Sequence, residues 1–176
     1  VEQWNKIAKK HKLEAKITET KYYEPILNQY GELVSKHPHP ASVTFCWMQG
    51  ERDAKENLSA AYSDAMKQLI ANLRRDLKQP EMNFVIGRLS DFKKDDDKSW
   101  TAVHDAQVAV ANDDPRGAWV DTDDLNDGVN RRGRQINNDL HYSAEGYKTF
   151  GKRMAEAAIR TMTAWPTPSR TCLDRR

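Results

Sequence analysis

Residues 42–48 read SVTFCWM, a short apolar run rich in residues that favour β-structure. The run predicts a strand buried on both faces, as in a parallel sheet, with Cys46 as a small buried hydrophobic side chain. Apolar side chains then recur every three or four residues over 58–77, which predicts a helix packed on the sheet. Residues 83–89, NFVIGRL, predict a second buried strand.

The same alternation continues to the C-terminal end of the chain. A helical stripe over 100–110 precedes a third, shorter strand at 118–121, and Ser143 is expected to cap a last helix that reaches about residue 162. Alternation of this kind predicts right-handed crossovers. We therefore expect an α/β three-layer sandwich with a parallel sheet flanked by helices.

The N-terminal part of the chain is less regular. Pro25 is expected to open a helix that ends at His37-Pro38-His39-Pro40, because each proline disfavours α geometry in the residue before it. Residues 1–24 give no firm prediction. Residues 169–176 follow two prolines and are expected to form a mobile tail.

Length and charge limit the classes of function. A chain of 176 residues with 38% hydrophobic residues suits one domain or a large part of one. Its 28 basic and 26 acidic residues nearly balance, so no nucleic-acid partner is indicated, and the basic run 131–134 is predicted to be a solvated loop. No apolar run approaches the roughly 20 residues that a membrane span requires.

In open parallel sheets, functional side chains gather in loops beyond the carboxyl ends of the strands. The loop after the first predicted strand places the Gln49 amide and the Glu51 carboxylate on either side of Gly50. Glycine lets the backbone turn sharply off a buried strand. The alternative interpretation is a tight turn with ordinary solvated charges.

A second candidate lies in the loop before the last helix, where Asp139 precedes His141 by two residues. A carboxylate at this spacing can reach the imidazole or fix its loop, and a histidine held in this way can act as a general base. The alternative is a histidine packed at a helix start, with Asp139 as the cap.

Taken together, WMQGERD at 47–53 and DLHYSAEGY at 139–147 resemble the sialate O-acetylesterase-like branch of the SGNH hydrolases, and related acetylxylan esterases look similar. HDAQV at 104–108 also resembles a stretch of that family, and the similarity covers roughly residues 22–160. It implies an SGNH, flavodoxin-like fold. It also implies a Ser-His-acid mechanism that removes acetyl groups from a carbohydrate substrate, with no metal and no cofactor.

The resemblance gives each site residue an expected role. It implies that His141 is the general base and that Asp139 holds its ring, with Glu51 as a rival or additional acid. Gln49, beside Gly50, occupies the position of an oxyanion-hole side chain, and its amide can donate to a developing negative charge.

The family's nucleophilic serine, in an early G-Q-S-N or G-D-S segment, has no counterpart here. Ser90 is expected to be a loop hydroxyl and Ser143 a helix cap. We therefore expect residues 1–168 to be the C-terminal part of one esterase domain that lacks its N-terminal strand. An upstream segment of the same protein would supply the serine. Relatives of this kind are often exported. The alternative is a non-catalytic carbohydrate-binding or interaction domain that retains the fold.

Overall fold

The computed structural model describes residues 1–14, 18–19, 21–93 and 97–163, so the predicted tail at 169–176 lies outside the described residues. The helices are α1 (Glu2–Lys10), α2 (Tyr23–Lys36), α3 (Glu51–Lys55), α4 (Ser59–Asp76), α5 (Lys98–Asn112) and α6 (Ala144–Thr163). The strands are β1 (Thr44–Trp47), β2 (Asn83–Gly87), β3 (Gly117–Val120), β4 (Gly128–Val129) and β5 (Gln135–Ile136).

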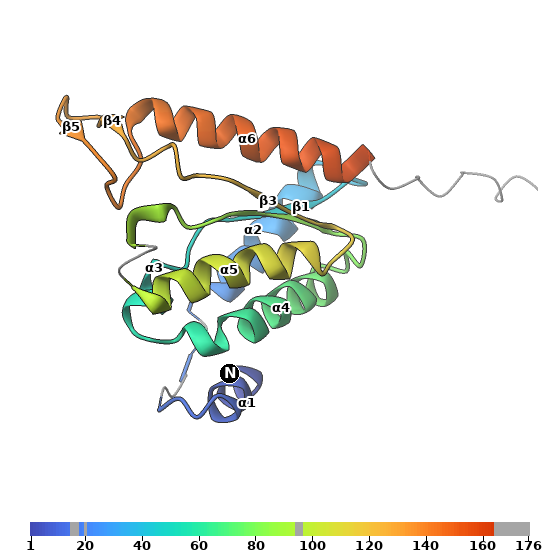
Figure 1. Cartoon of the computed structure of the whole chain (residues 1–176). Coiled ribbons are helices and arrows are strands. Elements are labelled where there is room, and N and C mark those ends of the chain that lie inside the picture. The colour runs from blue at the N-terminus through green and yellow to red at the C-terminus, as the bar shows by residue number, and fades with distance from the viewer. Residues whose placement is uncertain (15–17, 20, 94–96, 164–176) are drawn as a thin grey trace, which may run out of the picture.

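The first three strands form a parallel sheet in the order β1-β2-β3. Helix α6 lies across one face of this sheet, and α4 and α5 cover the other face, with α1 outside α4 (Figure 1). The prediction of an α/β architecture with a parallel sheet between two helical layers is confirmed. A small antiparallel hairpin, β4–β5, lies beside the start of α6 and was not predicted.

Strand β2 is central and every one of its residues is buried, as its continuous apolar sequence predicts. Its side chains alternate between two cores, because successive residues of a strand point to opposite faces. Phe84 and Ile86 pack with α4 and α5, whereas Val85 packs with Met154 of α6. The sheet thus anchors both helical layers.

The prediction that residues 42–48 are buried on both faces is wrong. Strand β1 pairs only with β2 among the described strands, and Cys46 is exposed. The sequence shows that a strand is apolar, but the exposure of that strand depends on which elements lie beside it in the fold. The free edge of β1 carries unpaired backbone groups that can accept a further strand.

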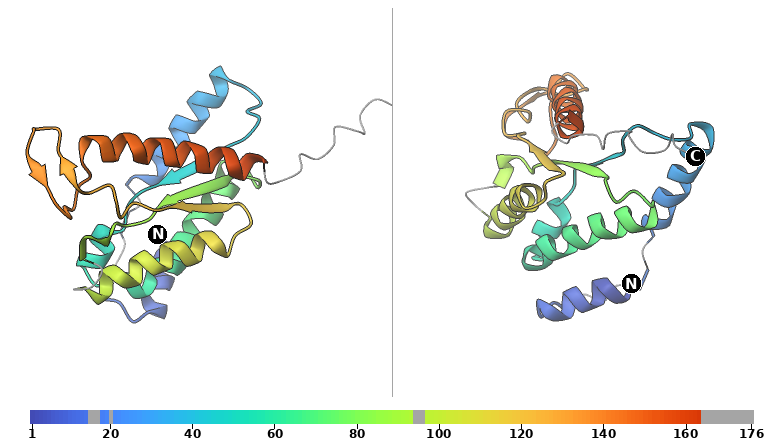
Figure 2. Two further views of the ribbon diagram at one scale, coloured as in Figure 1. Left: turned by 45° about the horizontal axis from the view of Figure 1, so that its top comes forward. Right: turned by 90° about the vertical axis from the view of Figure 1, so that its right-hand side faces the viewer.

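The N-terminal residues form more structure than their composition predicted. Helix α1 packs on α4, where the Asn72 amide donates to Gln3 (3.0 Å) and Lys10 pairs with Asp64 (2.6 Å). Helix α2 has no buried residue, and both views in Figure 2 show it projecting from the layered body. It begins two residues before Pro25 and ends before His37. Proline is tolerated in a first helical turn because the N–H groups there lack intrahelical partners.

Within the described part of the chain, no helix combines the length and the apolar character that crossing a membrane would require.

Candidate active site

The loop after β1 turns directly into a short helix. Gly50 is buried against α5, where a Cβ would lie 2.8 Å from Val103 Cγ1 and 3.1 Å from the amide nitrogen of Gln107. Only a residue without a side chain allows this close approach. Helix α3 then begins at Glu51, so the segment expected to be a loop is in part helical.

The backbone carbonyl of Gln49 is held by three donors. The Trp47 indole N–H (3.1 Å), the Tyr62 hydroxyl (2.8 Å) and the Gln107 side-chain amide (3.0 Å) all donate to it. Burial raises the pKa of Tyr62 to about 12, so its hydroxyl stays protonated and available as a donor at neutral pH. The backbone of the turn is therefore fixed from β1, α4 and α5.

Gln107 connects two strand ends, a role that sequence analysis did not assign. Its side chain is fully buried, and its amide oxygen accepts from the backbone N–H of Leu89 (2.7 Å), just beyond β2. Its amide nitrogen donates to Gln49 and to Tyr62. The sequence did contain a sign of this role, because Gln107 is a polar residue on the apolar stripe of the 100–110 helix. A buried amide must find hydrogen-bond partners.

The side-chain amide of Gln49 lies near the carboxyl of Asp53. Burial of that carboxyl raises its pKa, and the nearby Gln49 amide opposes the rise. A primary amide has two N–H donors, so one remains for another acceptor. The half-buried Gln49 amide therefore has donor capacity beyond any interaction with Asp53.

Glu51 folds back on its own helix start, where its carboxylate accepts from the backbone N–H of Gly50 (2.9 Å). Within the described residues, no hydrogen bond or ion pair joins Glu51 to His141.

Asp139 fixes the position of His141 mainly through the backbone. The Asp139 carboxylate accepts from the backbone N–H of His141 at 2.9 Å and lies 3.8 Å from the imidazole Nδ1. The second distance suits an ion pair and exceeds a hydrogen bond. The imidazole is 77% exposed, so it is open to solvent and to an approaching group.

The loop that carries Asp139 and His141 is clamped by the segment before β4. Asn126, which is 1% exposed, accepts through its carbonyl from Asp139 N–H (3.1 Å) and donates through its amide to Asn138 (3.0 Å). The Leu125 carbonyl accepts from Ser143 N–H (3.0 Å). Ser143 caps α6 as predicted, because its hydroxyl accepts from the N–H of Gly146 at 3.0 Å.

Two glycines of α6 give a matched test of this clamp. A Cβ at Gly146 would lie 2.1 Å from the Leu125 carbonyl oxygen, whereas at Gly151 nothing lies within 4 Å. We expect Gly146→Ala to lower the free energy of unfolding by about 1–3 kcal/mol through overpacking. Gly151→Ala should raise it by up to about 1 kcal/mol, because alanine is the better helix former. Urea unfolding measures both, and equal effects would contradict the proposed contact.

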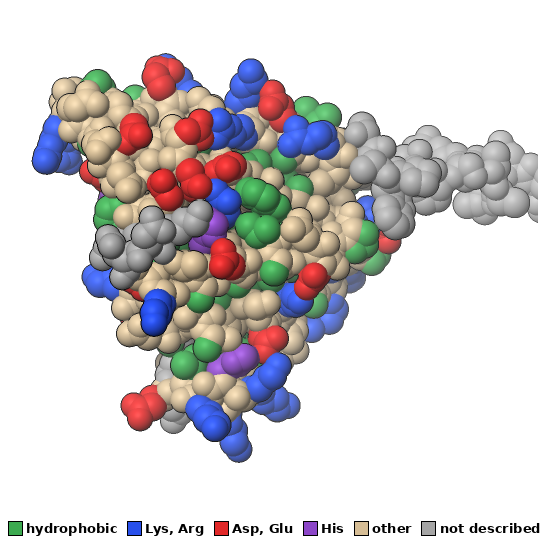
Figure 3. All heavy atoms as spheres, viewed as in Figure 1, with side chains coloured by type: hydrophobic (Ala, Val, Ile, Leu, Met, Phe, Trp, Pro, Cys, Tyr) green, Lys and Arg blue, Asp and Glu red, His purple; other side chains and the backbone are tan. Residues whose placement is uncertain are grey.

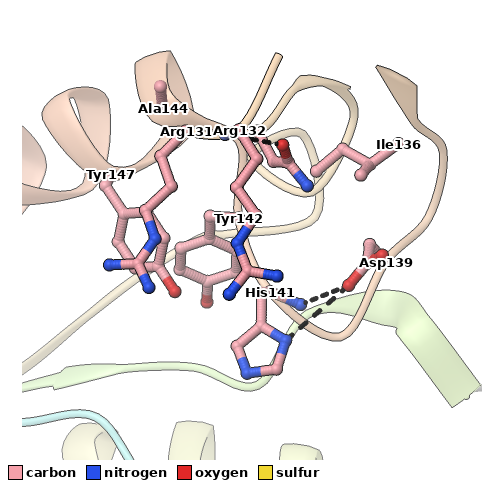
Figure 4. A pocket seen from close by; sticks show the side chains of 9 residues that line it. Arg131, Arg132, Ile136, Asp139, His141, Tyr142, Ala144 and Tyr147 are labelled. Carbon is pink, nitrogen blue, oxygen red and sulfur yellow. Dashed lines mark hydrogen bonds and ion pairs between the residues drawn. The ribbon is translucent and has the colours of Figure 1, made fainter. Parts of the chain in front are cut away.

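A pocket of about 610 Å³ opens beside the loop (Figure 4). Its lining comes from the β4–β5 hairpin, the loop and the start of α6, namely Asn130, Arg131, Arg132, Ile136, Asp139, His141, Tyr142, Ala144 and Tyr147. Asp139 and His141, predicted together, do line one pocket. Gln49, Gly50 and Glu51 do not line it.

Tyr142 connects this pocket with the turn after β1. Its ring lines the pocket, and its hydroxyl contacts the sulfur of Met48 (3.8 Å), the residue before Gln49. Burial raises the pKa of Tyr142, and the negative charge of Glu51 raises it further. Tyr142 therefore reaches from the pocket to the end of β1, next to the turn at 49–51.

No serine lines this pocket among the residues that the structure describes. Ser143 is buried as the cap of α6, and Ser90 is buried with its carbonyl bound by the Trp100 indole N–H (2.7 Å). The described ranges also contain no group of three or more His, Cys, Asp or Glu side chains that could hold a metal ion.

The acidic loop after β3 is neutralised by arginines. Arg88 pairs with Asp121 (2.5 Å) and Asp123 (2.7 Å), and Arg153 of α6 pairs with Asp124 (2.6 Å). On the face shown in Figure 3, acidic and basic side chains are accordingly interspersed over α6 and its surroundings. These ion pairs fix the loop that leads to β4 and the pocket.

Comparison with known protein families identifies the family to which the chain belongs. The model of the family described as "Carbohydrate esterase, sialic acid-specific acetylesterase" matches residues 1–160. The chain belongs to this family. The resemblance seen in the two motifs is thereby confirmed, and so is general esterase character as the family's activity. The comparisons with curated proteins and with solved structures gave no significant match.

Proposed function

We propose that this esterase-family chain carries the general base and one oxyanion donor of an enzyme that removes O-acetyl groups from carbohydrate. The observation that carries the proposal is the Asp139–His141 pair. The carboxylate lies 2.9 Å from the His141 backbone N–H and 3.8 Å from its ring, and the exposed imidazole lines a pocket of about 610 Å³. That volume lies within the range of small-molecule sites.

In the proposed reaction, a serine hydroxyl attacks the acetyl carbonyl and His141 accepts its proton. Asp139 stabilises the imidazolium, and the free N–H of Gln49 donates to the carbonyl oxygen as it gains negative charge. His141 then returns the proton to the departing sugar oxygen. Water attacks the acetyl-serine by the same route, so the products are acetate and the free sugar hydroxyl.

Asp139 is the better candidate for the acid. It contacts both the backbone and the ring edge of His141, whereas the Glu51 carboxylate accepts from Gly50 at the start of α3. Glu51 remains close enough to raise the pKa of Tyr142. Its proposed part is therefore to hold the turn that presents Gln49.

We propose that the serine comes from an upstream segment of the same protein, which adds a strand beside β1. The free edge of β1 and the exposed Cys46 support this placement. A strand paired there in the parallel direction, like the rest of the sheet, would end at the same edge as Gln49. The carbohydrate esterase domain would then be completed by that segment.

The second candidate is a carbohydrate-binding domain without catalysis, which the lack of a serine in the described pocket favours. Hydrolysis of p-nitrophenyl acetate by the full-length protein distinguishes the two. The esterase proposal predicts turnover well above the rate in buffer, together with a G-x-S turn after an apolar strand in the upstream coding sequence. A purified full-length protein without turnover would support the binding domain.

A further inference from the structure

A second cavity, of about 310 Å³, lies where α1 packs on α4, at the opposite end of the molecule from α6 (Figure 1). It shares no lining residue with the pocket that contains His141. Apolar side chains make up most of its wall, among them Trp4, Ile7, Leu13 and Leu58. A cavity of this volume and character suits a small organic molecule.

The charged side chains in this wall are both acidic. Asp53 of α3 is half-buried there, and Glu19 contributes a second carboxylate. Tyr62 also lines the cavity, but its hydroxyl already donates to the Gln49 carbonyl (2.8 Å). Among the lining residues that the structure describes, none is Lys, Arg or His, and no described side chain forms an ion pair with either carboxylate.

The lysines of α1 serve other carboxylates. Lys6 and Lys10 line a separate cavity, and each forms an ion pair there or beside it, at 2.7 Å and 2.6 Å. Burial raises the pKa of Asp53, and the neutral Gln49 amide opposes the rise only in part. A nearby cation would lower that pKa, so the surroundings of Asp53 are short of positive charge.

Trp4 adds a group that favours the same kind of ligand. The face of an indole ring attracts a cation electrostatically, and its apolar surface covers hydrocarbon. A ligand with an ammonium group could therefore pair with Asp53 while its apolar body contacts Trp4, Ile7 and Leu58. A neutral ligand would fill the same space but would leave the carboxylate without a partner.

We propose that the cavity between α1 and α4 binds a small organic cation, a primary amine with an apolar body, and that Asp53 binds its ammonium group. The inference goes beyond the proposed function and does not depend on it, because the two cavities have separate linings.

Calorimetric titration of the full-length protein at neutral pH tests the inference. The probes are 2-phenylethylamine and 2-phenylethanol, which share an apolar body and differ in charge. We expect the amine to bind at least about tenfold more tightly, as charge-assisted hydrogen bonds imply. Asp53→Asn should lose this preference. Glu32→Gln, which removes the same charge from an exposed position on α2, should keep it.

A second variant tests the location. Ala65 lines the cavity from α4, so Ala65→Leu should fill part of it and weaken binding of both probes. The inference is overturned if the unaltered protein binds the amine no more tightly than the alcohol, or binds neither. It is also overturned if Glu32→Gln reduces the preference as much as Asp53→Asn does, since net charge alone would then explain it. Unchanged affinities in Ala65→Leu would place the amine elsewhere and overturn it too.

Discussion

Replacing His141 by alanine in the full-length protein should lower kcat/KM for p-nitrophenyl acetate by about 10³-fold, within the range for loss of a general base. The imidazole is exposed and lines the pocket, so its removal disturbs no packing. Thermal unfolding should therefore stay unchanged while turnover falls.

His37 supplies the control for this variant. It is an exposed histidine in the proline-rich segment after α2. His37→Ala should leave turnover unaltered. Equal rates for the His141 variant and the unaltered protein would remove His141 from the reaction.

Gln107→Leu should lower the free energy of unfolding by about 2–4 kcal/mol, although leucine has a similar volume. The fully buried amide accepts from Leu89 N–H and donates to Gln49 O and Tyr62. Leucine leaves the Leu89 N–H buried without its acceptor. For a protein of this size, such a loss lowers Tm by roughly 5–15 °C.

The same substitution should also reduce turnover, because Gln107 helps to hold the backbone that presents Gln49. Gln29→Leu is the matched control, since Gln29 is exposed on α2 and the same chemical change there should move Tm very little. Calorimetry of the two variants measures the difference. A Gln107 variant as stable as the Gln29 variant would show that the buried hydrogen bonds contribute nothing.

The elements predicted correctly are those whose signal is local. Strand β2 is a mostly apolar run, which predicts a buried strand. Helix α4 repeats its apolar residues at helical spacing, which predicts a helix with one buried face. The exposure of Cys46 could not be predicted from the local sequence, because it depends on which strand lies beside β1. Helix α3 and the β4–β5 hairpin are too short to give a periodic signal.

The candidate site was predictable only in part for the same reason. The spacing of Asp139 and His141 is visible in the sequence, and the structure places both in one pocket. The clamp by Leu125 and Asn126 joins residues that are more than ten positions from their partners, so no local pattern reveals it. Arg131 and Arg132 looked like loop charges because the hairpin that turns them into the pocket was not foreseen.

The central claim is that Gln49 and His141 act on the same reacting group. A crystal structure of the full-length protein carrying a phosphonate adduct on its nucleophile tests this most directly. The account predicts the adduct on a serine, with its oxyanion-like oxygen about 3 Å from the Gln49 amide and the serine oxygen within about 3.5 Å of the His141 ring. The account would be contradicted if the sheet separated the adduct from the Gln49 amide or from the His141 ring.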